Sequence, residues 1–420
     1  MTRPYAYQQV GIDWLAARKH AILADDCGLG KTVQTIAACD AVGAVDVVVV
    51  CPASVRENWR REFEKFGVPR ERRLQVWSYD QAHKVPPGAV DVLVLDEGQY
   101  LKSPKAKRTR TVYGEKCDGV GGLVERAARV FVLSGTIMPN NPSEVWPHLR
   151  ALFPEQILSS VGKPYSIHQF IAKFCKTKDN GFGIQIVGAK NHDLLREKLE
   201  PVMLRRLKAD VLPDLPEITF DPLFVEGRIG VAGPEADIVR EVLEADGVEG
   251  LKRIAPHVAT LRRLTGMAKV EPVVEWVKEW LEGCDRKIVL FAHHREVIAE
   301  LFNTIGTADA VVVAGSTSDR QAAVDEFQND PACRVFIGQN TAAGTGITLT
   351  AASDLLLVEP SWVPSDNAQI AGRIHRIGQG RGCQVRFVTL AGSIDEQIGK
   401  ALARKAADIS AILDEPNVEN

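Results

Sequence analysis

The sequence has 420 residues, 45% of them hydrophobic and 25% charged, with a formal net charge of −3 and a pI near 6.3. These values exclude a largely disordered chain and give no overall sign of nucleic-acid binding, although they allow a local basic groove. The eight cysteines lack the spacing of a zinc site, no apolar run reaches membrane-spanning length, and the N-terminus has no apolar signal-peptide core. We therefore expect a cytoplasmic protein of two or three domains.

Short apolar runs rich in valine, isoleucine and leucine predict buried strands in both halves of the chain. They cover residues 20–25, 45–52, 90–97 and 128–136, and then 287–294, 309–316, 334–340, 353–360 and 384–391. Continuous rather than alternating apolar runs indicate parallel strands buried on both faces, with helical crossovers. Helical patterns do lie between them, for example at 55–66 and 319–328. The predicted fold class is therefore α/β, with two lobes.

The first run leads into DDCGLGKT, Asp25 to Thr32, and then into a helical pattern at 31–42. Strand, glycine-rich turn and helix form the context of a phosphate-binding loop, in which backbone N–H groups and the helix N-terminus face phosphate oxygens. Gly28 and Gly30 would shape the turn, Lys31 would reach the β- and γ-phosphates, and Thr32 would ligate Mg²⁺. Asp25 stands where the generic pattern has glycine. A glycine-rich turn with a solvated lysine would explain neither the threonine nor the helix.

Polar residues follow two later strands of the first half. Asp96 and Glu97 end the run at 90–97, and Ser134, Gly135 and Thr136 end the run at 128–136. Ligands of open parallel sheets gather at the carboxyl ends of the strands. In nucleotide hydrolysis one carboxylate holds Mg²⁺ and a second orients or deprotonates water, so we assign these roles to Asp96 and Glu97. A solvated strand end is the alternative, and the phosphate loop in the same lobe disfavours it.

The pattern changes between the two sets of strands, from about residue 154 to 224. It has no buried strand, and residues 191–217 look helical until their prolines. We interpret it as a mainly helical insertion or linker; the helical stretch 241–254 could belong to it or to the second lobe. The expected domains are residues 1–155 for the first lobe, 156–225 for the insertion and 226–420 for the second lobe with a C-terminal helix.

Two groups of cations are ambiguous. The run from Lys102 to Arg110 has five cations and no acid, and is either a solvated loop or a DNA-backbone contact. Arg205, Arg206 and Lys208 are either cations favoured by a helix C-terminus or residues with an interlobe or DNA role.

Near the far end, Gln369, Arg373 and Arg376 are spaced four and three residues apart, which predicts one helix face. An arginine fork directed at the γ-phosphate stabilises the charge of the transferring group. An arginine pair on a helix is more often solvated, but its position after AAGTGITLT and VEPSW favours a functional role.

In this order the motifs resemble those of helicase superfamily two, and more closely the Swi/Snf-type ATP-dependent DNA translocases. DDCGLGKT is similar to that family's DEMGLGKT, so Asp25 is no departure within it, and YQQVGIDWL resembles its Q motif, in which Gln8 would read adenine. CPASVRENWRREFEKF, DEGQYLKSPKAKR and LSGTIMPNNPSEVW resemble motifs Ia, II and III; MLRRLKADVLPDLPE resembles the stretch after the first lobe; AAGTGITLTAASDLLLVEPSW and QIAGRIHRIGQ resemble motifs V and VI. The FCKT, NHDLL and MLRR arrangement is most like the annealing-helicase (HARP-like) subgroup.

The resemblance implies two RecA-like lobes with ATP and Mg²⁺ in the cleft between them. Lys31, Thr32, Asp96 and Glu97 would come from the first lobe, and Gly346, Gln369, Arg373 and Arg376 from the second. The motor would step along double-stranded or forked DNA without reading its sequence, because such contacts go mainly to phosphates. The implied DNA-binding residues are Pro52, Ala53, Ser54, Ser134, Gly135, Thr136, Thr345 and Trp362.

Two residues depart from the family pattern: Gln99 replaces the usual histidine of motif II, and Ile137 the usual proline of motif III. A neutral amide can still form hydrogen bonds, so we expect hydrolysis to survive and coupling to DNA to be affected. Accessory domains are not obvious, which favours a bacterial or viral source.

Other functions remain compatible with the sequence. They are a strand-separating helicase on DNA or RNA, a nucleotide-controlled DNA clamp with little turnover, and a metabolic P-loop kinase. RIHRIGQ disfavours the first, the retained Glu97 disfavours the second, and the third has no use for two lobes and a distant arginine pair.

Overall fold

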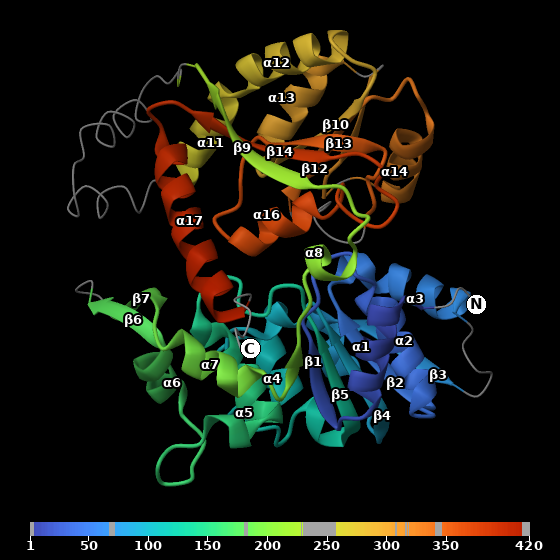
Figure 1. Ribbon diagram of the computed structural model, residues 1–420, viewed down its shortest axis with the longest axis vertical. Helices are drawn as coiled ribbons and strands as arrows, with labels where there is room; N and C mark the ends of the chain where they lie inside the picture. Colours follow the sequence, from blue (N-terminus) through green and yellow to red (C-terminus); the bar gives the residue numbers. More distant parts are fainter. Residues whose placement is uncertain are drawn as a thin grey trace. The chain divides into compact units, whose positions relative to one another are not determined.

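The computed structural model describes residues 4–66, 72–179, 184–227, 229, 258–306, 309–315, 317, 319–340 and 347–413 (Figure 1). The chain divides into two compact units, Met1–Asp214 with Arg404–Asn420, and Leu215–Ala403. Residues 404–413 group with the first unit, and Ile412 is buried in the apolar core of that unit. The three ranges expected from the sequence differ from these limits and stay a prediction.

The first unit is built on a six-stranded parallel sheet with the order β3-β2-β4-β5-β1-β8. Its strands are β1 His20–Leu23, β2 Asp46–Cys51, β3 Arg73–Ser78, β4 Val90–Asp96, β5 Ala127–Leu133 and β8 Met203–Leu204. Because all neighbours are parallel, the segments that follow β1, β2, β4 and β5 meet at one edge of this sheet. The phosphate loop and the paired carboxylates therefore share that edge.

Both faces of the first sheet are covered, as continuous apolar strands require. Ala21 and Leu23 pack on one side with α1 to α3, whereas Ile22 packs on the other with α4 to α7. The helices are α1 Ala6–Ala16, α2 Lys31–Ala41, α3 Arg56–Lys65, α4 Lys107–Tyr113, α5 Trp146–Leu152, α6 Ile167–Phe174 and α7 His192–Leu199.

The second unit repeats this architecture with the parallel strand order β11-β12-β10-β13-β14-β9. Its strands are β9 Ile218–Val225, β10 Lys287–Ala292, β11 Ala310–Val313, β12 Val335–Gln339, β13 Ala352–Leu357 and β14 Cys383–Leu390. Its helices are α11 Val258–Ala268, α12 Val270–Glu282, α13 Arg295–Ile305, α14 Arg320–Asn329, α16 Pro364–Ala371 and α17 Ile394–Leu413, which ends in the first unit. The predicted α/β class with two lobes is confirmed.

All nine predicted strands are present, and the helices expected at 31–42, 55–66 and 319–328 are α2, α3 and α14. Within the two six-stranded sheets the pattern missed β3, β8 and β9, which lie at sheet edges and bury few residues. Such strands carry no continuous apolar run because solvent reaches much of their surface. The apolar pattern alone therefore found every inner strand and the edge strand β11.

The segment between the lobes is more varied than expected. It contains the antiparallel hairpin β6 Cys175–Asp179 and β7 Ile184–Ala189, and the short helix α8 Lys208–Val211. Within residues 191–217 the helix α7 ends at Leu199, because Pro201 disfavours helix at the residue before it; Met203 and Leu204 then pair with β1 before α8 begins at Lys208. The stretch 241–254 lies outside the described residues. Among the helices that the structure describes, none has the length and apolar character needed to cross a membrane.

Candidate active site

The loop between β1 and α2 has the backbone of a phosphate cradle. Gly28 has φ 94° and Gly30 has φ 76°, in the left-handed region that side chains disfavour. A Cβ atom at Gly30 would also lie 2.6 Å from Nε2 of Gln8. The backbone angle therefore requires glycine at Gly30, and a side chain there would also have to displace the amide of Gln8.

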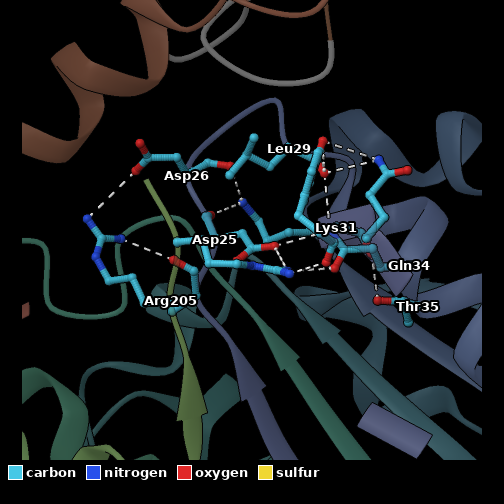
Figure 2. Close-up of polar contacts among 11 residues, drawn as sticks. Asp25, Asp26, Leu29, Lys31, Gln34, Thr35 and Arg205 are labelled. Atoms are coloured by element: carbon cyan, nitrogen blue, oxygen red, sulfur yellow. Dashed lines mark hydrogen bonds and ion pairs between the residues drawn. The ribbon is translucent and has the colours of Figure 1, made fainter. Parts of the chain in front are cut away.

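Lys31 and Thr32 are the first two residues of α2, at the helix end whose N–H groups lack partners within the helix. The Lys31 ammonium donates to the carbonyl oxygens of Asp25, at 2.5 Å, and Asp26, at 3.2 Å (Figure 2). A phosphate bound at this helix end could take over those hydrogen bonds. The loop, the helix end and the cation together suit a phosphate group.

Gln8 contacts this loop from α1. Its Nε2 donates to the Leu29 carbonyl at 3.3 Å, and its Oε1 accepts from the backbone N–H of Tyr5 at 3.1 Å. Both ends of the amide are thus used within the protein, and the residue is only 6% exposed. To bind adenine, Gln8 would have to give up at least one of these hydrogen bonds. Its role in adenine recognition stays a prediction.

Asp25, the residue in place of the generic glycine, is completely buried. Arg206 pairs with it at 2.9 Å and 2.5 Å, and Gln34 donates to it at 3.1 Å. Burying a carboxylate is costly unless it is paired and hydrogen-bonded, so these partners explain how the acid is accommodated. No local pattern in the sequence indicates this pair.

Arg205 braces the same loop. One guanidinium nitrogen donates to the carbonyl oxygens of Ala24, at 3.1 Å, and Gly135, at 3.2 Å, and another lies 3.7 Å from the Asp26 carboxylate (Figure 2). The interpretation of Arg205 and Arg206 as helix C-terminal cations is wrong, because they follow strand β8. Lys208 begins α8, and its backbone N–H donates to Asp26 at 3.1 Å. An interlobe or DNA role for these residues stays a prediction.

Asp96 ends β4 and is held by three donors. Its Oδ2 accepts from the Trp59 indole at 2.7 Å, its Oδ1 from the Glu97 N–H at 3.0 Å, and its carbonyl from the Tyr79 hydroxyl at 2.8 Å. Burial, followed by the charge of Glu97, raises the pKa of Asp96 above its usual range. Burial thus disfavours the ionised form of Asp96, and a nearby cation would stabilise that form.

Glu97 has a left-handed backbone, with φ 53° and ψ 57°. A non-glycine residue in this region costs about 1–3 kcal/mol and is often found at functional sites. Gln99 Nε2 donates to Glu97 at 2.7 Å, and the Ser134 hydroxyl donates to Gln99 Oε1 at 2.6 Å. Thr136 N–H donates to the Ser134 hydroxyl at 3.0 Å. Gln99 therefore joins the loops after β4 and β5.

The predicted DNA-binding residues of the first unit differ in exposure. Three are buried, namely Pro52, Ser134 and Gly135; two are exposed, namely Ala53 and Ser54; Thr136 is half-buried. Ile137, which stands where the family usually has proline, is buried as well. Only the exposed and half-buried members offer side-chain surface to a ligand, and the buried ones shape the loops.

In the second unit the predicted helix face is wrong. Gln369 lies in α16, but that helix ends at Ala371, and Arg373 and Arg376 lie in the turns beyond it. The helix tightens there, since the Arg373 N–H donates to the Ile370 carbonyl three residues earlier. The structure nevertheless brings the arginines together, because both donate to the Ile347 carbonyl, at 3.3 Å and 3.1 Å.

Three further predicted residues belong near motif V. Thr345 and Gly346 lie outside the described residues. Trp362 is half-buried, and the Arg262 guanidinium lies 5.8 Å from its ring centroid. Its predicted DNA contact stays a prediction.

The basic run divides into two groups. Lys102 pairs with Glu144 at 3.2 Å, and Arg108 donates to the Tyr100 carbonyl at 2.7 Å. The other three cations line a pocket of about 410 Å³, whose lining residues are Lys105, Lys107, Arg110, Thr111, Glu115, Val120 and Gly121. Lys102 and Arg108 thus make contacts within the protein, and the other three cations face a hollow on its surface.

The described residues contain no group of three or more His, Cys, Asp or Glu side chains that could hold a metal alone. Mg²⁺ in nucleotide sites needs only one or two protein oxygens in addition to phosphates and water. The Thr32 hydroxyl and the Asp96 carboxylate are oxygen donors of the right kind. The residues present therefore fit Mg²⁺ bound together with a nucleotide.

Comparison with known families gives two matches. A family described as "SNF2-related domain" matches residues 7–86 and 77–226, and one described as "Helicase conserved C-terminal domain" matches residues 269–378. The first match includes the phosphate loop and the loops after β4 and β5. The second includes α16 and both arginines.

Curated relatives match nearly the whole chain. A Caenorhabditis elegans homolog of SWI/SNF-related matrix-associated actin-dependent regulator of chromatin subfamily A-like protein 1 is 28% identical, over 96% of this chain and 61% of its own length. The Mus musculus DNA annealing helicase and endonuclease ZRANB3 is 27% identical, over 96% of this chain and 40% of its own length. The chain therefore spans less than two thirds of these relatives.

Among solved structures, the Sulfolobus solfataricus SWI2/SNF2 ATPase core in complex with dsDNA is 21% identical, with a TM-score of 0.44, and the match covers 99% of this chain and 98% of that one.

Proposed function

Because this chain belongs to the SNF2-related family, we propose that it is an ATP-dependent motor that moves along double-stranded DNA. One observation carries the proposal: the hydrogen bonds from Glu97 through Gln99 to Ser134 and Thr136. They connect the carboxylate suited to hydrolysis with a loop suited to nucleic acid. A motor requires such a connection, because ATP turnover must change its hold on the track.

In the proposed reaction the first lobe binds the nucleotide. Lys31 and the N–H groups around Gly28 and Gly30 bind the phosphates, and Gln8 reads adenine after releasing a bond to its neighbours. Thr32 and Asp96 hold Mg²⁺, which when bound neutralises phosphate charge. Glu97 orients the attacking water and accepts its proton.

The second lobe contributes Gly346 and Gln369 to the nucleotide, and Arg373 and Arg376 to the γ-phosphate. The shared use of the Ile347 carbonyl supports this role, since it holds two guanidinium groups at one place. Positive charge fixed there stabilises the charge of the transferring phosphoryl group.

On the DNA side we propose phosphate contacts by Ala53, Ser54 and Thr136 of the first lobe, over loops shaped by Pro52, Ser134 and Gly135. From the second lobe, Thr345 and Trp362 contact the DNA. The pocket lined by Lys105, Lys107 and Arg110 adds a further contact with the phosphate backbone of the DNA. Such contacts are independent of sequence, so duplex and forked DNA both fit.

The wider activities are also proposals. Remodelling or reannealing DNA, or displacing bound proteins, fits a motor of this kind, and one of the relatives is a DNA annealing helicase and endonuclease. A cytoplasmic setting and a bacterial or viral source rest on the sequence alone.

The deciding experiment measures ATP hydrolysis alone and with single-stranded DNA, duplex DNA, forked DNA and RNA. Strong stimulation by duplex or forked DNA is the expected result, and triplex displacement would then test movement. Stimulation by single strands alone would favour a strand-separating helicase, and stimulation by RNA alone an RNA motor. ATP binding without turnover would favour the clamp.

A further inference from the structure

None of the roles proposed above involves Trp59. This residue is 1% exposed and lies on α3, which begins directly after the short helix Ala53–Val55. Its indole N–H reaches across to β4 and donates to Asp96 Oδ2 at 2.7 Å. The segment that carries the exposed Ala53 and Ser54 is thus joined, through one helix, to the proposed metal ligand.

This hydrogen bond bears on the orientation of the carboxylate. The terminal torsion of an aspartate is broad, so neighbouring donors decide where its oxygens point. The Glu97 N–H donates to Oδ1 and the Trp59 indole donates to Oδ2, so the plane of the carboxylate is fixed. The remaining lone pairs of both oxygens are then available to a metal. An indole N–H only donates, so it cannot compete for the metal.

We propose that Trp59 is a positioning residue that orients Asp96 for Mg²⁺, and that DNA bound at Ala53 and Ser54 acts on the metal site through it. This inference rests on the proposed function. Partners that orient metal ligands typically change metal affinity by 10–100-fold when removed.

A purely structural role is the competing explanation. Trp59 packs in the apolar core, and its ring centroid lies 6.0 Å from that of Phe63. Phe63 is equally buried on the same helix but has no polar atom to offer Asp96. Phe63→Leu is therefore the matched control for disturbed packing.

The experiment measures Mn²⁺ affinity by electron paramagnetic resonance in the presence of a non-hydrolysable ATP analogue. We expect Trp59→Phe to weaken Mn²⁺ binding about 10-fold or more, whereas Phe63→Leu keeps the wild-type affinity. Melting curves confirm that both variants fold. Equal Mn²⁺ affinities in wild type and Trp59→Phe would overturn the positioning role.

Duplex DNA supplies the second readout. DNA should tighten Mn²⁺ binding in the wild type and not in Trp59→Phe, because linked sites shift each other's affinity only through a shared element. An equal DNA effect in both would overturn the link through Trp59. Wild-type Mn²⁺ binding without DNA-stimulated hydrolysis would instead count against the proposed function and leave the positioning role standing.

A spectroscopic test covers the case in which Trp59→Phe does not fold. In the wild-type chain labelled with ¹⁵N at its indole nitrogens, the indole proton bound to a carboxylate should resonate downfield of the others. Adding Mg²⁺ to the nucleotide complex should shift that resonance. An unmoved resonance would overturn the proposal.

Discussion

Arg206 pairs with the fully buried carboxylate of Asp25 across 181 residues of sequence. The pair ties the phosphate loop to the segment after the first lobe, and Gln34 and the Tyr7 carbonyl complete its hydrogen bonds. The loop's conformation therefore depends on a residue that generic phosphate-loop patterns do not contain.

Removing Arg206 should destabilise the first unit. Arg206→Met leaves the buried Asp25 without its cation, and breaking a buried pair typically costs about 3–5 kcal/mol. Urea unfolding measures the loss. Adding Asp25→Gly, which restores the generic loop residue, should recover much of it, because the uncompensated charge is then gone. A double variant as unstable as Arg206→Met alone would contradict this account.

Lys31→Ala and Glu97→Gln should separate binding from chemistry. Lys31→Ala loses the cation at the phosphates and should weaken both ATP binding and turnover. Glu97→Gln keeps the size of the side chain but loses the base, so ATP should still bind while hydrolysis falls about 10²–10⁴-fold. Fluorescent-nucleotide binding and phosphate release measure the two steps, with the exposed Lys65→Ala as control. Full turnover in Glu97→Gln would remove that residue from the mechanism.

Gln99 should matter for coupling. Gln99→Leu removes the bonds to Glu97 and Ser134, so the ratio of DNA-stimulated to basal hydrolysis should fall by about tenfold, equivalent to one to two hydrogen bonds. Ser134→Ala should lower the same ratio, and the double variant should add little, because both changes break one connection. Additive losses would show that the two residues act separately.

The inner strands and the loop positions could be predicted from the sequence because continuous apolar runs and glycine spacing are local signals. The edge strand β8 could not, because Met203 and Leu204 pair with β1 through backbone groups that leave no pattern. Of the two interpretations of Arg205 and Arg206, only that of helix C-terminal cations is wrong, since α7 ends at Leu199 and the two arginines follow β8. The end of α16 at Ala371 depends on turns around Gly372 that spacing alone does not reveal.

Acid should destabilise the first unit through two desolvated histidines, the half-buried His20 and the buried His148. Burial, followed by the charge of Lys19, lowers the pKa of His20 to about 4, and burial lowers that of His148 to about 3. An unfolded chain takes up these protons near pH 6.5, whereas the folded one does not until its lower pKa values. Stability therefore falls as the pH drops from about 6.5 towards 4.

His20→Phe tests this pH dependence. The buried Nδ1 of His20 has no hydrogen-bond partner among the residues that the structure describes, so phenylalanine breaks no bond there. Urea midpoints at pH 7.5 and pH 5 should differ less in His20→Phe than in wild type. The exposed His83→Gln should keep the wild-type difference. An unchanged difference in His20→Phe would mean that His20 is protonated equally in both states.

Salt dependence should identify the basic pocket as a DNA contact. Lys105 and Lys107 have no ion-pair partner within the described part of the chain, and Arg110 has only the exposed Glu115, at 3.5 Å. Each duplex phosphate neutralised contributes a slope of about −0.9 in log affinity against log salt. Replacing all three cations by glutamine should therefore flatten the slope by about one to three.

The matched control changes the same charge elsewhere in the first unit, with Lys173, Lys176 and Lys178 replaced by glutamine; all three are exposed. If the pocket holds a phosphate, the pocket variant flattens the slope and the control does not. An equal flattening in both variants would mean that DNA affinity depends on the net charge of the protein and not on the position of these cations. Unchanged slopes in both would assign the pocket cations to solvent, while Lys102 and Arg108 would keep their internal contacts with Glu144 and Tyr100.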